Sequence, residues 1–154
     1  MTRHFLRDDD LSSSEQAEIL DLAVSLKSDR FGSNVFAGPK TVALIFDKPS
    51  TRTRVSFSVG VTELGGAPLI IDSAVSQMAS KESVADTARV LDRQVSMIVW
   101  RTFAQSGLEQ MAQNSKVPVI NSLSDEFHPC QLLADLMTIK EKLGNLQGKV
   151  LCYI

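Results

Sequence analysis

Apolar runs of strand length alternate with helical patterns along this chain, and that alternation limits the fold more than any other feature. Residues 41–46 form a continuous apolar run with β-branched side chains, as expected of a strand buried on both faces of a sheet. Three later segments are predicted as further strands, at residues 67–72, 96–100 and 117–121.

Helical segments precede and separate these strands. Ser12 and Glu15 match a capping box that opens a helix over residues 13–28. Further helices are predicted from Thr51 to the glycines at 65 and 66, from Ser83 to Leu91, over 108–113 and over 129–143. The repeated order of strand and helix predicts an α/β fold: an open four-stranded parallel sheet with helices on both faces.

The composition excludes several classes of protein. The chain has 154 residues, 44% of them hydrophobic and 22% charged, which is typical of one globular domain. Its formal net charge of −2 argues against binding to nucleic acid or to a membrane surface. No stretch approaches the roughly 20 apolar residues of a membrane span, and the charged N-terminus lacks the apolar core of a signal peptide. We therefore expect a cytoplasmic protein with reduced thiols.

The sequence offers no sign of a metal or a nucleotide cofactor. Its cysteines and histidines, Cys130, Cys152, His4 and His128, show none of the paired spacings of zinc ligands. Neither the P-loop pattern nor the dinucleotide pattern G-x-G-x-x-G occurs. We expect neither a metal nor a cofactor.

The C-terminal residues stand apart from the predicted sheet. Residues 145–149 have the composition of a turn, and residues 150–154 start a fifth apolar strand in which the chain stops. We interpret residues 1–144 as one domain. Residues 145–154 would be the turn and truncated first strand of a second domain, missing here, in a longer protein.

Residues 50–54 read Ser-Thr-Arg-Thr-Arg, and they stand where the strand at 41–46 gives way to a helix. Backbone N–H groups at the start of a helix lack partners and carry partial positive charge, which favours an anion. Hydroxyl groups and the planar forks of arginine add donors that suit phosphate or carboxylate oxygens. Helical rotation turns Arg54 away from Arg52, so the participation of Arg54 is left open.

Polar residues also follow the other predicted strands. They occupy residues 73–81, Arg101 with Thr102, and residues 122–131. Parallel sheets bind ligands beyond the carboxyl ends of their strands, where these segments should meet residues 50–54. The sequence thus predicts one anion-binding site at this edge of the sheet.

Five motifs together resemble one family. They are Phe-Asp-Lys-Pro-Ser-Thr-Arg-Thr-Arg at 46–54, Asp-Thr-Ala-Arg-Val-Leu at 86–91, Trp-Arg-Thr at 100–102, Phe-His-Pro-Cys-Gln at 127–131 and Leu-Ala-Asp-Leu at 133–136. In this order they resemble the ornithine carbamoyltransferases, over the whole chain. The resemblance is to the N-terminal half of that family, which binds carbamoyl phosphate. Cys130 favours the ornithine branch, because the aspartate branch usually has threonine there.

The resemblance implies roles for the site residues. Arg101 would contact the phosphate and carbamoyl oxygens, His128 the carbonyl oxygen and Gln131 the carbamoyl NH2. The other implied contacts to carbamoyl phosphate are Ser50, Thr51, Arg52, Thr53, Gln77, Pro129 and Cys130. The loop with Gln77 would reach the site of a neighbouring subunit in a homotrimer, although Met78-Ala79-Ser80 stands where the family often has glycine.

The function that the resemblance implies is transfer of the carbamoyl group to the side-chain amine of ornithine, which gives citrulline and phosphate in arginine biosynthesis. This half alone should be inactive. Two alternatives stay open: aspartate or another amine as acceptor, and a non-catalytic module that binds a phosphometabolite or forms trimers. Two residues also have other possible roles. Arg101 could stack on Trp100, and Cys130 could be a packed residue instead of a nucleophile.

Overall fold

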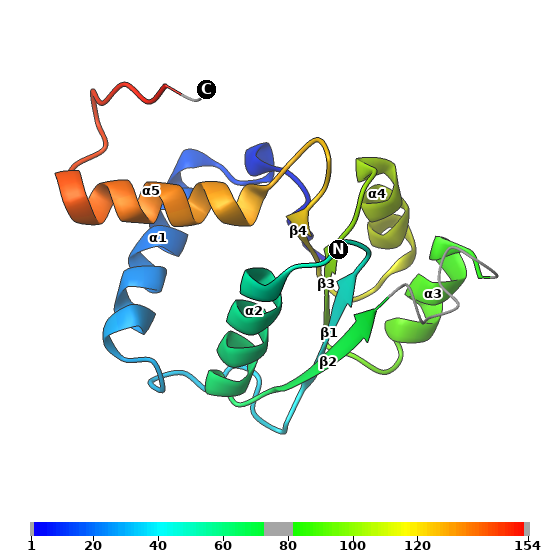
Figure 1. Cartoon of the computed structure of the whole chain (residues 1–154). Coiled ribbons are helices and arrows are strands. Elements are labelled where there is room, and N and C mark those ends of the chain that lie inside the picture. Colours follow the sequence, from blue (N-terminus) through cyan, green and yellow to red (C-terminus); the bar gives the residue numbers. More distant parts are fainter. Residues whose placement is uncertain (1, 73–81, 153–154) are drawn as a thin grey trace.

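A parallel sheet forms the centre of the described part of the protein (Figure 1). The computed structural model describes residues 2–72 and 82–152. Within these ranges the sheet has four strands in the order β2-β1-β3-β4. Their bounds are β1 Thr41–Phe46, β2 Ala67–Asp72, β3 Met97–Arg101 and β4 Val119–Leu123. Every pairing between them is parallel, as the sequence predicts.

Helices cover both faces of the sheet because the chain turns in opposite directions after β1 and after β2. The crossover to β2 carries α2 (Thr51–Glu63), whereas the crossovers to β3 and β4 carry α3 (Val84–Leu91) and α4 (Gln105–Asn114). Right-handed crossovers that run in opposite directions place their helices on opposite faces. Figure 1 shows α2 on one side of the sheet and α3 and α4 on the other.

The side chains of β1 divide the core into two layers. Ala43 and Ile45 belong to the cluster under α3 and α4, while Val42, Leu44 and Phe46 belong to the cluster under α2. This alternation follows from the two-residue period of a strand. A strand buried on both faces must be apolar throughout, which is why residues 41–46 are predicted correctly from sequence.

Two further helices pack against each other beside the sheet. They are α1 (Ser13–Ser28) and α5 (Pro129–Leu143), and both match the predicted bounds. Lys27 pairs with Glu141, and Lys140 with Asp21, across their contact. Ser12 and Glu15 form the predicted capping box.

Some predicted boundaries differ from the structure. α4 begins at Gln105 instead of residue 108, and β4 runs two residues later than 117–121. Pro118 has no N–H to give to a sheet, which delays the strand. The strand then continues past Asn121, the last residue of the predicted strand, through buried Ser122, whose polar side chain had indicated a loop.

The N-terminal segment covers the outer edge of β4, which the sequence did not indicate. Phe5 forms a parallel bridge with Ile120; its N–H donates to Val119 O at 2.9 Å, and its carbonyl accepts from Asn121 N–H at 2.8 Å. A short 3-10 helix, η1 (Asp8–Asp10), then leads to α1. The edge strand is therefore paired by the chain itself.

The predicted strand at 150–154 is not formed at 150–152, and residues 153 and 154 lie outside the described residues. Val150 and Leu151 are 96% and 60% exposed. A strand needs a neighbour to hydrogen-bond, and no strand of the described part lies beside this segment. None of the helices in the described ranges combines the length and apolarity needed to cross a bilayer.

Two glycines provide a matched test of the packing. A Cβ on Gly66 would lie 2.8 Å from Phe36 Cβ and 3.0 Å from Lys40 O, whereas a Cβ on Gly60, inside α2, would meet nothing within 4 Å. We expect Gly66→Ala to lower the free energy of unfolding by about 1–3 kcal/mol and Gly60→Ala to raise it by about 1 kcal/mol. Urea unfolding measures both, and changes of the same sign would contradict this packing.

The N-terminal segment should respond to pH through His4. His4 Nδ1 accepts from Val119 N–H at 3.2 Å, and burial lowers the His4 pKa against the opposing effect of Asp10. In the unfolded chain His4 binds a proton as the pH falls below about 6.5, whereas in the folded chain it does so only at a lower pH. The free energy of unfolding is therefore highest above about pH 6.5 and declines as the pH falls toward the lowered pKa of His4 in the folded chain.

His4→Asn tests this effect, because it keeps an acceptor beside Cγ and cannot titrate. We expect its free energy of unfolding to fall less between about pH 7 and pH 5 than that of the unmodified chain. Parallel pH curves would show that His4 does not carry this dependence.

Candidate functional site

A crevice of about 310 Å³ opens at the carboxyl edge of the sheet, between the start of α2, the end of β3 and the start of α5. This is the switch point between β1 and β3, where open α/β sheets bind ligands. The crevice is lined by Ser50, Arg52, Thr53, Ser56, Phe57, Arg101, His128, Cys130, Gln131 and Ala134.

Most of the predicted site residues therefore come together. Thr51 and Pro129 do not line the crevice themselves, although each is the first residue of a helix that does. Gln77 lies outside the described residues. The additional lining residues Ser56 and Phe57 lie four positions after Arg52 and Thr53, so helical spacing could have identified them.

The first turn of α2 forms one wall. Ser50 is the N-cap, with extended backbone, and its Oγ accepts from the backbone N–H of Thr53 at 3.3 Å. The preceding N–H groups have no acceptor within the helix, and the helix dipole makes this end partially positive. Together with the exposed side chain of Arg52, this wall is suited to phosphate.

Arg101 forms the floor of the crevice. It is the last residue of β3, opposite Phe46 at the end of β1, and its Nη1 donates to Thr53 Oγ1 at 3.4 Å. Its Nε is buried and has no acceptor among the described residues. Trp100 lies instead in the apolar cluster beneath α3 and α4, where its indole N–H donates to Asp47 at 3.0 Å. Strand alternation thus separates the two side chains, and Arg101 does not stack on Trp100.

His128 forms the opposite wall as the N-cap of α5. Its pKa is lowered by burial and by the positive charge of Arg101, with Asp135 acting weakly in the other direction. The imidazole is therefore neutral at neutral pH and offers one N–H donor. Its Nδ1 is buried without a partner in the described part of the chain.

Cys130 is a packed residue and not a nucleophile. Burial raises the pKa of its thiol to about 12, so the thiolate is absent at neutral pH. The thiol donates to the carbonyl of Asn121 at 3.3 Å. Its place in the crevice is that of a small wall residue.

The two arginines of the Ser-Thr-Arg-Thr-Arg segment have different surroundings. Arg54 forms a bidentate pair with Asp72 at the end of β2, with Nη1 to Oδ2 at 3.1 Å, and its guanidinium lies 4.6 Å from the ring centre of Phe46. Arg52 lines the crevice and makes no ion pair with any residue that the structure describes. The sequence left open whether Arg54 takes part in the anion site. In the structure its guanidinium is paired with Asp72 instead.

Lys48 connects the loops that carry the site, a role that the sequence did not reveal. Its ammonium pairs with Asp125 in the loop after β4 and lies 4.6 Å from the ring of Phe103 in the loop after β3. The N–H of Asp125 also donates to Phe103 O at 2.7 Å. These contacts fix the start of α2 relative to the start of α5.

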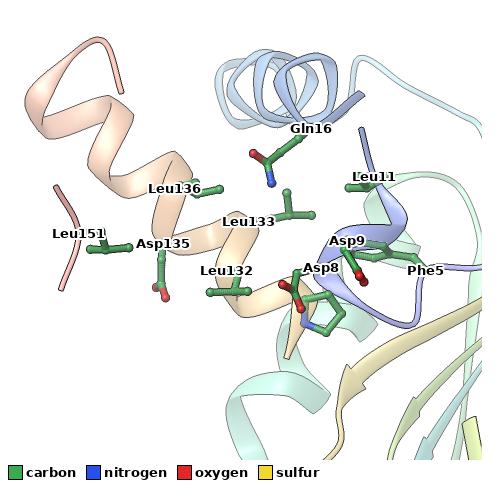
Figure 2. A pocket seen from close by; sticks show the side chains of 11 residues that line it. Phe5, Asp8, Asp9, Leu11, Gln16, Leu132, Leu133, Asp135, Leu136 and Leu151 are labelled. Carbon is green, nitrogen blue, oxygen red and sulfur yellow. The ribbon is translucent and has the colours of Figure 1, made fainter. Parts of the chain in front are cut away.

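A second cavity, of about 290 Å³, lies between the N-terminal segment, α1 and α5 (Figure 2). Its walls are mainly apolar, and its charged residues are carboxylates, which would repel an anion. These residues are Phe5, Asp8, Asp9, Leu11, Gln16, Pro129, Leu132, Leu133, Asp135, Leu136 and Leu151. It is therefore not the anion site. Within the described ranges, no group of His, Cys, Asp or Glu is arranged to hold a metal.

Comparison with known proteins gives one consistent result. The family described as aspartate/ornithine carbamoyltransferase, carbamoyl-P binding domain, matches residues 3–141. An ornithine carbamoyltransferase of Clavibacter sepedonicus is 65% identical over 154 residues, which are 100% of this chain and 50% of that protein. The chain spans about half the length of the curated relatives that it matches.

Two solved structures show the same fold. Ornithine carbamoyltransferase from Thermus thermophilus has a TM-score of 0.89 and 38% identity, over 96% of this chain and 51% of that one. An N-acetyl-L-ornithine transcarbamylase has a TM-score of 0.85 and 33% identity, over 95% of this chain and 50% of that one.

The different surroundings of the two arginines lead to a binding prediction. We expect Arg52→Ala to weaken the affinity of the chain for inorganic phosphate by about 10- to 100-fold, because a charge-assisted hydrogen bond is lost. Arg54→Ala should weaken it by less than about threefold, because Arg54 is held by Asp72. Titration calorimetry measures both affinities, and equal losses would contradict the assignment.

Proposed function

The chain belongs to the aspartate/ornithine carbamoyltransferase family, and on this premise we propose that it is the carbamoyl-phosphate-binding half of an ornithine carbamoyltransferase. The reaction moves the carbamoyl group of carbamoyl phosphate to the side-chain amine of ornithine, in arginine biosynthesis. The observation that carries this proposal is the crevice itself, which joins the positive end of α2 to Arg101, His128 and Gln131.

In this proposal the phosphate lies at the first turn of α2. The backbone N–H groups of Thr51 and Arg52, the hydroxyl groups of Ser50 and Thr53, and the Arg52 guanidinium supply its donors. The carbamoyl group then extends toward the start of α5, where Pro129 and Cys130 shape the wall. Gln77 would come from the loop of a neighbouring copy.

The chemistry requires donors that face the oxygens on which charge develops. The ornithine nitrogen attacks the carbamoyl carbon and loses a proton, and the carbon–oxygen bond to phosphate breaks so that phosphate leaves with the electron pair. Negative charge grows on the carbonyl oxygen, where neutral His128 and cationic Arg101 can each offer N–H donors, and on the phosphate. Fixed donors of this kind stabilise the transition state more than the ground state.

The proposal includes an assembly and a cellular place. We propose a cytoplasmic homotrimer with active sites between subunits, in which residues 1–144 form the carbamoyl-phosphate domain and residues 145–154 lead into the ornithine-binding domain. Apolar side chains on the outer strand β2 and on α2 support an interface there, since Val55, Leu69 and Ile70 are 55%, 44% and 42% exposed.

A second candidate keeps the chemistry and changes the acceptor. The N-acetyl-L-ornithine transcarbamylase shares this half of the fold at 33% identity, so the half present here does not by itself select the amine. Aspartate or another amine is therefore the alternative acceptor. A non-catalytic module that binds a phosphometabolite or forms trimers is the alternative of another class.

Turnover decides between these candidates. The chain is joined to the remaining half of the Clavibacter sepedonicus enzyme and assayed with carbamoyl phosphate and ornithine, N-acetylornithine or aspartate. We expect citrulline from ornithine. Because the second half of the chimaera comes from the relative, the acceptor itself is tested with the longer protein that we propose contains this chain, and product from aspartate alone there would exclude ornithine as acceptor. Two results together would favour the non-catalytic module. The chimaera would show no turnover, and sedimentation would show that the chain alone forms a stable trimer that binds carbamoyl phosphate at micromolar concentration.

Arg101 offers a test of the bidentate contact. In the same chimaera we expect Arg101→Lys to lower kcat by about 100- to 1,000-fold, because an ammonium cannot replace the planar fork. Arg89→Lys is the matched control, since Arg89 lies on α3 and pairs with Asp86 away from the crevice. Near-normal kcat in Arg101→Lys would count against this role.

A further inference from the structure

Asp135 lies one turn after Gln131 on α5, and its carboxylate determines how the Gln131 amide is oriented. Gln131 Nε2 donates to Asp135 Oδ1 at 2.8 Å. A carboxylate only accepts hydrogen bonds, so the NH2 of Gln131 and not its oxygen must face Asp135. The amide oxygen is then left for another donor, and Gln131 lines the crevice.

The helix itself brings these two side chains together. Residues four apart lie on one face of a helix, and side chains tilt toward its N-terminus, so Asp135 leans over the turn that holds Gln131. Figure 2 shows Leu133 and Leu136 pointing toward α1, whereas the carboxylate of Asp135 points away from α1. Among the described residues Asp135 forms no ion pair, and its carboxylate accepts the hydrogen bond from Gln131.

The charge of Asp135 also reaches the other group on this wall. His128 begins α5, and the Asp135 carboxylate opposes the lowering of the His128 pKa by burial and by Arg101. The charged or titratable side chains that line the crevice are Arg52, Arg101, His128 and Cys130, and none of them is a carboxylate that could take the place of Asp135 beside Gln131.

We propose that Asp135 is a positioning residue that makes this site select carbamoyl over acetyl groups, by holding the Gln131 amide oxygen toward the crevice. The proposal rests on the function proposed above, in which the ligand is carbamoyl phosphate. It goes further because it assigns the choice of acyl group to a residue outside the crevice wall.

The physical basis is a difference of one hydrogen bond. A carbamoyl NH2 donates to the Gln131 oxygen, whereas the methyl of an acetyl group leaves that oxygen unpaired against an apolar surface. Sites that present a hydrogen-bonding partner reject analogues that lack the matching group more strongly than apolar pockets reject size changes. Without Asp135, the amide can rotate and present NH2 or oxygen, and the preference is lost.

The experiment compares two stable probes that differ in this one group. Phosphonoacetamide ends in a carbamoyl-like amide and acetonylphosphonate ends in a methyl ketone; inorganic phosphate reports on the phosphate cradle alone. Affinities of the 154-residue chain for each are measured by NMR titration for the unmodified chain, Asp135→Asn and the control Asp21→Asn. Asp21 is a suitable control because its carboxylate pairs with Lys140 on the α1–α5 contact.

We expect the unmodified chain and Asp21→Asn to prefer phosphonoacetamide by about tenfold, and Asp135→Asn to lose most of this preference. The affinity of Asp135→Asn for inorganic phosphate should stay within about twofold of that of the unmodified chain, because the first turn of α2, where phosphate would bind, is unchanged. The side-chain NH2 signals of Gln131 should shift in Asp135→Asn, and the His128 pKa should fall further. A purely structural role would weaken all three ligands together.

The outcomes separate this inference from the function on which it rests. If Asp135→Asn keeps the preference for the amide probe, or if the unmodified chain has none, the inference is wrong while phosphate binding in the crevice still stands. If the unmodified chain binds none of the three probes in the crevice, the proposed function itself fails, and the inference fails with it.

Discussion

The parallel pairing of β1 with β3 is the contact on which the candidate site depends. It sets Phe46 opposite Arg101, so that the end of β3 lies beside the turn that leads into α2. The strand order also reverses between β1 and β3, because the chain adds β2 on one side of β1 and β3 on the other. This reversal places α2 and α3 on opposite faces of the sheet and leaves an opening between them. A register shift of one residue would turn Arg101 to the other face and Trp100 into the crevice.

The hydrogen-bond donors of the site, cationic Arg101 and neutral His128, are partly buried. Arg101 has a buried Nε, and its charge joins burial in keeping His128 neutral. Hydrogen bonds in such a low-dielectric place are stronger than in water. Lys48 and Asp125 connect the two sides, so the donors are positioned before a ligand arrives. The thiol of Cys130 takes no part in this chemistry, because its burial keeps it protonated.

The sequence predicted those parts of the fold that local pattern determines. The apolar run of β1 and the capping box of α1 needed no knowledge of neighbours, and the sheet follows from their alternation with the other elements. Three features depended on distant contacts and were missed: the bridge of Phe5 to Ile120, the polar strand residue Ser122, and the link from Lys48 to Asp125. Most of the predicted site residues line one crevice, because they lie at the end of β3 or in the segments that follow β1 and β4 at the same edge of the sheet.

The central claim is that an oxyanion binds where the first turn of α2 meets Arg101 and His128. A crystal structure of the chain with phosphonoacetamide tests it most directly. We expect the phosphonate at the N–H groups of Thr51 and Arg52, with its amide between His128 and Gln131. An empty crevice with the ligand ordered elsewhere on the molecule would contradict it.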